Sequence, residues 1–164
     1  PAGASRACAS FAARYHRRWA LVVFSRQASS ASATPLFARA QEEIGTLYYD
    51  KPELIEHGGD TVLHLPIAVD GTGHGNASEY YLRRSGGWDR IDSDQWVTDL
   101  TGRLPKALQI WHGVWPDLRT MTAEAGLFRD GDPNCCPTGG VARVRLVIRG
   151  KAFVIDTLEI RKTP

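Results

Sequence analysis

The C-terminal residues 141–161 carry the pattern that most constrains the fold of this chain. The run VARVRLVIR is followed by Gly150 and Lys151 and then by AFVIDTLEIR, so two apolar, β-branched stretches flank a two-residue turn. A glycine at the first central position suits a tight type II′ turn. The resulting register pairs Arg145 with Asp156 on one face and gathers apolar side chains on the other. We expect an antiparallel hairpin here.

A second strand pattern lies upstream of the hairpin. Along residues 61–69 apolar side chains alternate with others, which is typical of a strand with one buried face. The glycine-rich run DGTGHGN then reverses the chain, residues 78–84 return, and a pair of glycines turns it again before a short strand at residues 88–91. The pattern predicts an antiparallel meander.

Two segments carry helical patterns. Between Phe37 and Leu47 apolar residues recur at helical spacing with charged residues between them, which predicts a short amphipathic helix. Asp92 followed by Gln95 resembles a capping box, and the apolar residues after it fall on one helical face. A second helix is therefore expected over residues 93–104.

Residues 108–114 and 122–128 add two less regular strand candidates. Together with the meander, the hairpin and the helices they predict an α+β fold, in which about two short helices pack on a mostly antiparallel sheet. The length of 164 residues and the hydrophobic content of 43% are ordinary for a globular domain with a core of its own.

Residues 1–34 differ in composition from the rest of the chain. They contain five arginines, many alanines and serines, and no acidic residue. A basic start, an apolar middle and an Ala-Ser-Ala end follow the order of a secretory signal, although the apolar middle is shorter than the usual ~7–15 residues. A targeting or processed segment and a flexible leader both stay open. We expect a leader, targeting or disordered segment at 1–34 and a single α+β domain at 35–164.

Charge and hydropathy limit the expected partners. The net charge is +2, the basic excess lies in residues 1–34, and no basic stripe interleaved with aromatics follows it. A nucleic-acid partner is therefore not expected. The apolar runs are far shorter than the ~20 residues of a membrane-spanning helix. The expected partner is an unidentified small ligand or protein.

The stretch DPNCCPTGG places Cys135 and Cys136 side by side in a turn-forming loop. Adjacent Cα atoms lie ~3.8 Å apart, below the ~4.4–6.8 Å of most disulfides, so a bond between them closes a strained ring that is easier to reduce. Two free thiols, a thiol-redox site and a soft-metal site are the alternatives, although no second cysteine pair supplies further ligands. A vicinal disulfide is the interpretation that we favour over a bridge to Cys8.

Six other residues are candidate binding residues. Two are tryptophans that can stack on sugars or peptides, although large aromatics more often pack in cores. A histidine lies between them, and three polar residues belong to the glycine-rich run, which resembles a phosphate loop but lacks the full motif and a following helix. The six residues are Asp70, His74, Asn76, Trp111, His112 and Trp115.

An enzyme is the alternative to a binding module. A hydrolase would use His74 or His112 as a base, with Asp70, Asp117 or Glu124 as an acid or orienting partner. The chain contains neither a G-x-S-x-G nor an H-E-x-x-H motif. The sequence therefore favours a protein without catalytic activity.

Asp130 and Asp132 begin a stretch that resembles a calcium loop. An EF-hand requires glycine at the sixth position and glutamate at the twelfth, where this chain has Cys135 and Val141. Carboxylates of an ordinary solvated turn explain the pattern better than an irregular calcium site does. We expect neither a metal ion nor a cofactor.

Several stretches together resemble a group of uncharacterised bacterial exported domains with an Asn-Cys-Cys-Pro motif near the C-terminus. They are GGWDRID, the Leu-Pro pair at 104–105, VWPDLRTMTAEAGLFRDGDPNCCPTGG and the closing hairpin. The resemblance covers residues 45–160 and rests mainly on residues 134–137. It implies a periplasmic or secreted setting, where disulfides persist, and no established activity. We therefore expect an extracytoplasmic binding or structural module with a rigid, redox-sensitive Cys-Cys loop.

Overall fold

The computed structural model describes residues 6–11, 18–26, 31–42, 47–69 and 78–162. Strands dominate this part of the chain, and it contains one helix. In chain order the elements are β1 (Arg6–Phe11), β2 (Arg18–Arg26), β3 (Thr34–Glu42), β4 (Leu47–Tyr49), β5 (Glu53–His57), β6 (Asp60–Leu65), β7 (Ile67–Val69), β8 (Glu79–Arg84), β9 (Gly87–Arg90), α1 (Gln95–Arg103), β10 (Thr122–Leu127), β11 (Gly140–Arg149) and β12 (Ala152–Arg161).

The prediction of an α+β fold with about two helices is wrong, because the described residues are mostly β with α1 as their one helix. The expected helix starting at Phe37 is replaced by β3, which pairs antiparallel with β2. Helical spacing is a local signal, whereas β2 offers a row of backbone hydrogen-bond partners along most of β3. Long-range pairing therefore decides the conformation of this segment.

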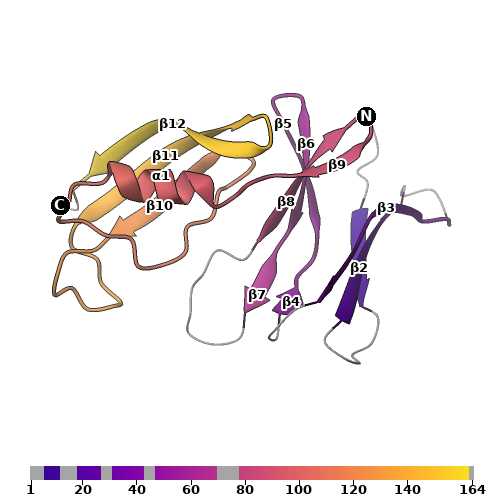
Figure 1. Cartoon of the computed structure of the whole chain (residues 1–164), viewed down its shortest axis with the longest axis horizontal. Helices are drawn as coiled ribbons and strands as arrows, with labels where there is room; N and C mark the ends of the chain where they lie inside the picture. The colour runs from indigo at the N-terminus through magenta and orange to yellow at the C-terminus, as the bar shows by residue number, and fades with distance from the viewer. Residues whose placement is uncertain (1–5, 12–17, 27–30, 43–46, 70–77, 163–164) are drawn as a thin grey trace.

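The strands form three main antiparallel sheets and one small ladder. The sheet orders are β1-β2-β3, β5-β6-β8-β9 and β10-β11-β12, and β4 pairs with β7. Figure 1 shows α1 lying across the β10-β11-β12 sheet, with the four-stranded sheet between this part and the β1-β2-β3 sheet. We call β5-β6-β8-β9 the central sheet.

The expected meander is confirmed in β6, β8 and β9, which pair in this order. Its first strand was predicted over residues 61–69, which is wrong at its end, because β6 stops at Leu65 and residues 67–69 form β7, which pairs with β4. The central sheet also contains β5, which was not predicted from the sequence and which joins β6 through a turn at Gly58 and Gly59. Both glycines have positive φ, 58° and 89°, which suits a two-residue hairpin turn. The glycine-rich run at residues 70–76 lies outside the described residues.

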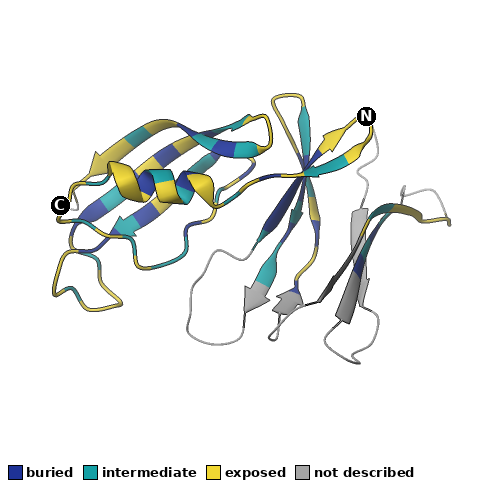
Figure 2. Ribbon diagram, in the orientation of Figure 1, coloured by how far each residue is buried: buried dark blue, intermediate teal, exposed yellow. Residues whose placement is uncertain are grey.

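The strand β6 contributes buried residues to both faces of the central sheet, so the prediction of one buried face on β6 is wrong. Val62 belongs to a first core with residues of α1 and the β10-β11-β12 sheet, including Trp96 and Phe153. Leu63, its neighbour in β6, points to a second core together with Leu21 of β2. Figure 2 shows the buried residues concentrated in the central strands and beneath α1. One strand thus contributes to both cores because successive side chains point to opposite faces.

The helix α1 confirms the second helical prediction. Trp96 and Leu100 are both fully buried against the sheet, which is the face that their spacing predicted. Asp92 Oδ1 accepts hydrogen bonds from the backbone N–H groups of Asp94 and Gln95, each at 3.0 Å. The Gln95 side chain binds the Asp99 carboxylate instead of returning to Asp92, so only half of a capping box forms.

The C-terminal hairpin of β11 and β12 is confirmed around its turn. Gly150 adopts a φ of 62°, and the pairing runs in the expected register as far as Leu146 opposite Ile155. A β-bulge then shifts the register, so Arg145 lies opposite Thr157 rather than Asp156. The predicted Arg145–Asp156 pair is therefore wrong.

The two weaker strand candidates have different outcomes. Residues 122–128 are confirmed as β10, whereas residues 108–114 form an irregular segment. This segment is held by an isolated bridge, in which Gln109 and Phe128 exchange two backbone hydrogen bonds of 2.9 Å. The bridge matters for the site below, because it lays the segment beside the loop that follows β10.

β1 and β2 lie within residues 1–34, and Leu21 and Val23 of β2 are buried in the second core. Whether this segment is a leader separate from a domain at 35–164 stays a prediction. Within the described part of the chain, the one helix is too short and too polar to cross a bilayer.

Candidate functional site

The loop between β10 and β11 is organised around one carboxylate. Asp132 Oδ2 accepts hydrogen bonds from the backbone N–H of Arg129 at 2.7 Å and of Thr138 at 2.9 Å, and Oδ1 accepts one from the Thr138 hydroxyl at 2.8 Å. These bonds, led by that from Arg129, hold the pKa of Asp132 below its ordinary value. Asp132 thereby ties together the two ends of the loop.

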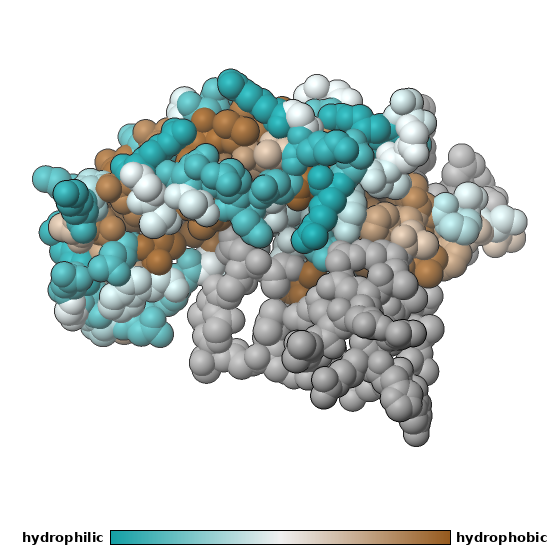
Figure 3. All heavy atoms as spheres, viewed as in Figure 1, coloured by the Kyte–Doolittle hydropathy of each residue, from teal (hydrophilic) through white to brown (hydrophobic). Residues whose placement is uncertain are grey.

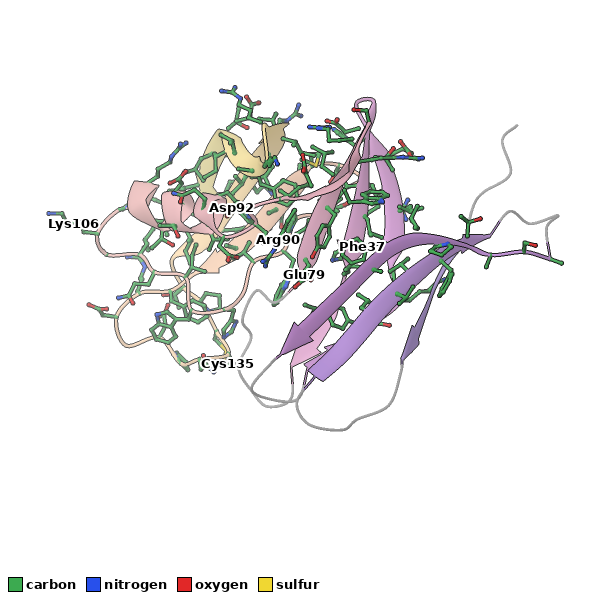
Figure 4. All side chains as sticks on the ribbon, turned by 45° about the vertical axis from the view of Figure 1, so that its right-hand side comes forward. Phe37, Glu79, Arg90, Asp92, Lys106 and Cys135 are labelled. Carbon is green, nitrogen blue, oxygen red and sulfur yellow. A yellow bond between two sulfur atoms is a disulfide. The ribbon has the colours of Figure 1, made fainter. Side chains whose placement is uncertain are left out.

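A vicinal disulfide joins Cys135 and Cys136 in this loop, which confirms the interpretation favoured from the sequence. Their Cα atoms lie 3.8 Å apart, and both residues are exposed. The backbone N–H of Cys136 donates a hydrogen bond of 2.9 Å to the carbonyl of Pro133, which closes a turn around the pair. Figure 4 shows Cys135 on this loop, outside the sheet.

The irregular segment before β10 packs against the loop through a network of side chains. Gln109 donates to the Asp130 carboxylate at 3.0 Å and accepts from the Trp111 indole at 3.1 Å. The Trp111 ring stacks on Phe128 with a centroid distance of 4.6 Å and a plane angle of 9°. His112 meets the same Phe128 ring edge-on at 5.2 Å. Phe128 therefore fixes the positions of both predicted site residues.

His112 also contacts the residue that precedes the disulfide. Its Nε2 lies 3.1 Å from Oδ1 of Asn134, a hydrogen bond in which the imidazole N–H donates to the amide oxygen. The imidazole therefore connects the irregular segment before β10 to the Cys-Cys loop.

A hollow of about 290 Å³ opens beside the loop. Trp115 lines it and is 45% exposed, and Pro137, which follows Cys136, forms part of its wall. Glu124 of β10 adds a carboxylate, which is paired with Arg143 at 2.5 Å. The lining thus combines an exposed aromatic face with polar groups whose charges are largely balanced. We call this hollow the aromatic hollow; its lining includes Ile110, His112, Trp115, Glu124, Phe128 and Pro137.

A wider hollow of about 520 Å³ lies at the start of α1. Two of its charged groups already have partners: Lys151 binds the Asp89 carboxylate at 3.0 Å, and Asp92 accepts a bond from the backbone N–H of Gln95 at the start of the helix. Figure 3 shows hydrophobic atoms exposed among hydrophilic ones over the part that holds α1 and the β10-β11-β12 sheet. The aromatic hollow remains the stronger candidate because several predicted site residues meet there.

The structure brings together half of the six predicted binding residues. His112 and Trp115 line the aromatic hollow, and Trp111 stacks on its Phe128 wall. The other three, Asp70, His74 and Asn76, lie outside the described residues.

Sequence reasoning missed Phe128 and Pro137 as parts of the site. Proline at the end of the Asn-Cys-Cys-Pro run was a visible signal, because it fixes the backbone direction after the cysteines. Phe128 gave no such signal, since it reaches the site only through its bridge to Gln109. Trp88 of β9 lies away from this site, and its indole N–H donates to the Leu36 carbonyl at 3.0 Å.

The carboxylates of the loop act as hydrogen-bond acceptors in this structure. Asp132 binds the two backbone N–H groups and the hydroxyl described above, and Asp130 binds the Gln109 amide. Among the described residues, His, Cys, Asp and Glu side chains form no group of three or more that would hold a metal ion.

Comparisons of the chain with known protein families, with curated proteins and with solved structures found no match. The site must therefore be interpreted from its own geometry.

Proposed function

We propose that this chain is an extracytoplasmic binding module that holds neutral carbohydrates in the aromatic hollow. The observation that carries the proposal is the 45% exposure of Trp115 on a concave surface. A tryptophan usually buries most of its surface, so one left open at the rim of a hollow is typical of a ligand-stacking residue.

The chemistry of the lining supports a sugar as the ligand. The C–H face of a pyranose ring packs on an indole ring, and its hydroxyls bond to carboxylate and imidazole groups, here Glu124 and His112. Because Glu124 is paired with Arg143, the hollow offers little net charge to an ionic ligand. A few polar groups in a mostly apolar hollow are the usual composition of a small-molecule site.

The disulfide supports the extracytoplasmic part of the proposal. Exposed disulfides persist in oxidising compartments and are reduced in the cytosol. The same setting is implied by the resemblance to exported domains with an Asn-Cys-Cys-Pro motif, and membership in that group is likewise our proposal. The extracytoplasmic setting and the membership in the exported group are tested by the intact mass of protein taken from its native compartment, measured with and without alkylation. Two free thiols at Cys135 and Cys136 would contradict both proposals.

Binding is tested with a glycan array followed by tryptophan fluorescence titration of the best neutral glycan. Trp115→Ala is expected to weaken binding by about tenfold, the size of one lost stacking contact. Ile160→Ala is the matched control, because Ile160 is a 37% exposed apolar residue outside the aromatic hollow. An array without hits, or equal losses in both variants, would contradict the proposal.

The hydrolase alternative has weaker support. His112 and Glu124 do line one hollow, but Nε2 of His112 is bonded to the Asn134 amide rather than to a carboxylate, and Glu124 is paired with Arg143 rather than with His112. His74 lies outside the described residues. The soft-metal alternative requires thiolates, which the oxidised pair does not offer.

A further inference from the structure

We propose that Cys135–Cys136 is a thiol–disulfide exchange site, and that its reduction by an external dithiol releases His112 and Pro137 and weakens binding in the aromatic hollow. The thiol–disulfide exchange and the release of His112 are inferred from the geometry of the loop alone. The effect on ligand affinity rests on the proposed function.

The disulfide is accessible and constrained. Both cysteines are exposed, so the pair lies at the surface, where a dithiol can approach it without unfolding of the chain. Their Cα atoms are held 3.8 Å apart by the peptide bond between them, whereas most disulfides join Cα atoms ~4.4–6.8 Å apart. Exposed and constrained disulfides are the ones that exchange readily with thiols.

The exchange balances with a dithiol as the reductant. One thiolate of the dithiol attacks a sulfur of the pair, the Cys135–Cys136 bond breaks, and the released cysteine thiolate takes up a proton. The second thiolate of the dithiol then attacks its own sulfur in the mixed disulfide and releases the other cysteine, which is also protonated. The dithiol loses two electrons and two protons and becomes a cyclic disulfide, and the cysteine pair gains them.

The residues on both sides of the pair connect it to the hollow. Asn134, directly before Cys135, accepts the hydrogen bond from His112 at 3.1 Å. Pro137, directly after Cys136, lies in the wall of the hollow. Its ring packs so closely on the backbone of Gly126 that a Cβ added at that glycine would lie 2.9 Å from Pro137 Cγ. A change in the backbone of the pair therefore moves residues that contact the hollow.

The rest of the loop is anchored, which confines the change to this short stretch. Asp132 binds Arg129 and Thr138, and the backbone N–H of Gly139 donates to the Leu127 carbonyl at 2.7 Å. None of these bonds involves an atom of Cys135 or Cys136. Reduction should thus relax the segment from Asn134 to Pro137 while the strands stay paired.

The test compares a Cys8→Ser chain, which keeps Cys135–Cys136 as its only cysteine pair, with a Cys8→Ser/Cys135→Ser/Cys136→Ser chain. Both full-length chains are treated with excess dithiothreitol, with glutathione disulfide as an internal standard of reduction. Alkylation and mass spectrometry follow the thiols, and NMR follows the His112 imidazole and Trp115 indole resonances. We expect two newly alkylated thiols and shifted His112 resonances in the first chain, and neither in the second.

The outcomes separate the parts of the proposal. If Cys135–Cys136 stays oxidised after the glutathione disulfide is fully reduced, the pair is not an exchange site. Complete reduction without a change at His112 overturns the coupling to the loop. Neither readout needs a ligand, so both can succeed even where no glycan binds and the proposed function fails. If a glycan does bind, its affinity should fall by about two- to tenfold on reduction, the effect of one hydrogen bond. Equal affinity in both forms would overturn the regulation and leave the proposed function standing.

Discussion

The imidazole ring of His64 lies parallel to the phenol ring of Tyr80, with the centroids 4.8 Å apart and the planes 7° apart. The two residues are directly opposite each other in β6 and β8. Burial is the main cause that lowers the pKa of His64, and the Glu53 carboxylate, 4.0 Å from Nδ1, opposes it in part. The buried Nε2 makes no hydrogen bond to any described residue. The site thus favours the neutral ring.

The His64–Tyr80 stack predicts a pH dependence of stability. The folded-state pKa lies below the ordinary value of 6.5, so the unfolded chain binds more protons as the pH falls below 6.5. The stabilisation is fully present above that value and is lost as the pH falls toward the folded-state pKa. His64→Phe keeps a flat ring on Tyr80 and removes this titration. Urea unfolding between about pH 7 and pH 5 should show a smaller loss of unfolding free energy than in the parent chain.

The control for this experiment is His57→Phe, which replaces an exposed histidine at the end of β5. It measures what the same substitution does away from the Tyr80 ring. Equal slopes for His64→Phe and the parent would show that His64 does not cause the dependence.

Two glycines with positive φ predict a matched pair of stability changes. Gly140 has a φ of 105°, and a Cβ there would collide with the carbonyl oxygen of Arg161, whereas Gly150 has a φ of 62° and open space around it. Gly150→Ala should cost about 1–2 kcal/mol through its backbone alone. Gly140→Ala should cost about 1–3 kcal/mol more, because β11 and β12 must also separate. Chemical denaturation checks both, and equal losses would contradict the close approach.

The helix cap predicts a difference between two neighbouring aspartates. Asp92→Ala should lower the unfolding free energy by about 1 kcal/mol, because it removes the acceptor of two backbone N–H groups at the start of α1. Asp94→Ala is the control, since Asp94 precedes the helix but its side chain makes no capping bond. The two variants are compared by thermal unfolding at neutral pH. If Asp94→Ala lowers the unfolding free energy more than Asp92→Ala does, then Asp94 rather than Asp92 caps the helix.

The parts of the fold that the sequence predicted depend on near neighbours. The α1 helix follows from the Asp92 cap and the spacing of Trp96 and Leu100. The β11–β12 turn follows from Gly150, and the pairing holds until the bulge at Arg145. A bulge adds one residue to one strand, and neither the charge pattern nor the apolar alternation distinguishes it from continued pairing.

The parts that the sequence did not predict depend on distant partners. β3 has helical spacing and becomes a strand because β2 lies beside it. Both faces of β6 are buried because α1 with its sheet covers one and β2 covers the other. For the site, the Cys-Cys loop and the tryptophans were predicted from composition. The contact between their two segments at Phe128 could not be predicted, since it requires the bridge between Phe128 and Gln109.

Asp132 predicts how the Cys-Cys loop responds to acid. Its pKa is lowered chiefly by the N–H groups of Arg129 and Thr138, so the folded-state pKa is below that of the unfolded chain. Its stabilising effect is therefore present above the ordinary value of 3.8 and lost as the pH falls through the folded-state pKa. Asp132→Ala should remove the anchor at every pH, while the β10–β11 pairing remains.

Amide hydrogen exchange measures this prediction residue by residue. In Asp132→Ala the amides of Arg129 and Thr138 should exchange faster than in the parent chain at neutral pH, because each loses its acceptor. Asp130→Ala is the matched control in the same loop, since Asp130 accepts a bond from the Gln109 side chain. It should leave those two amides protected. If both variants expose them equally, the loop opens as a whole, and the anchoring role belongs to no single carboxylate.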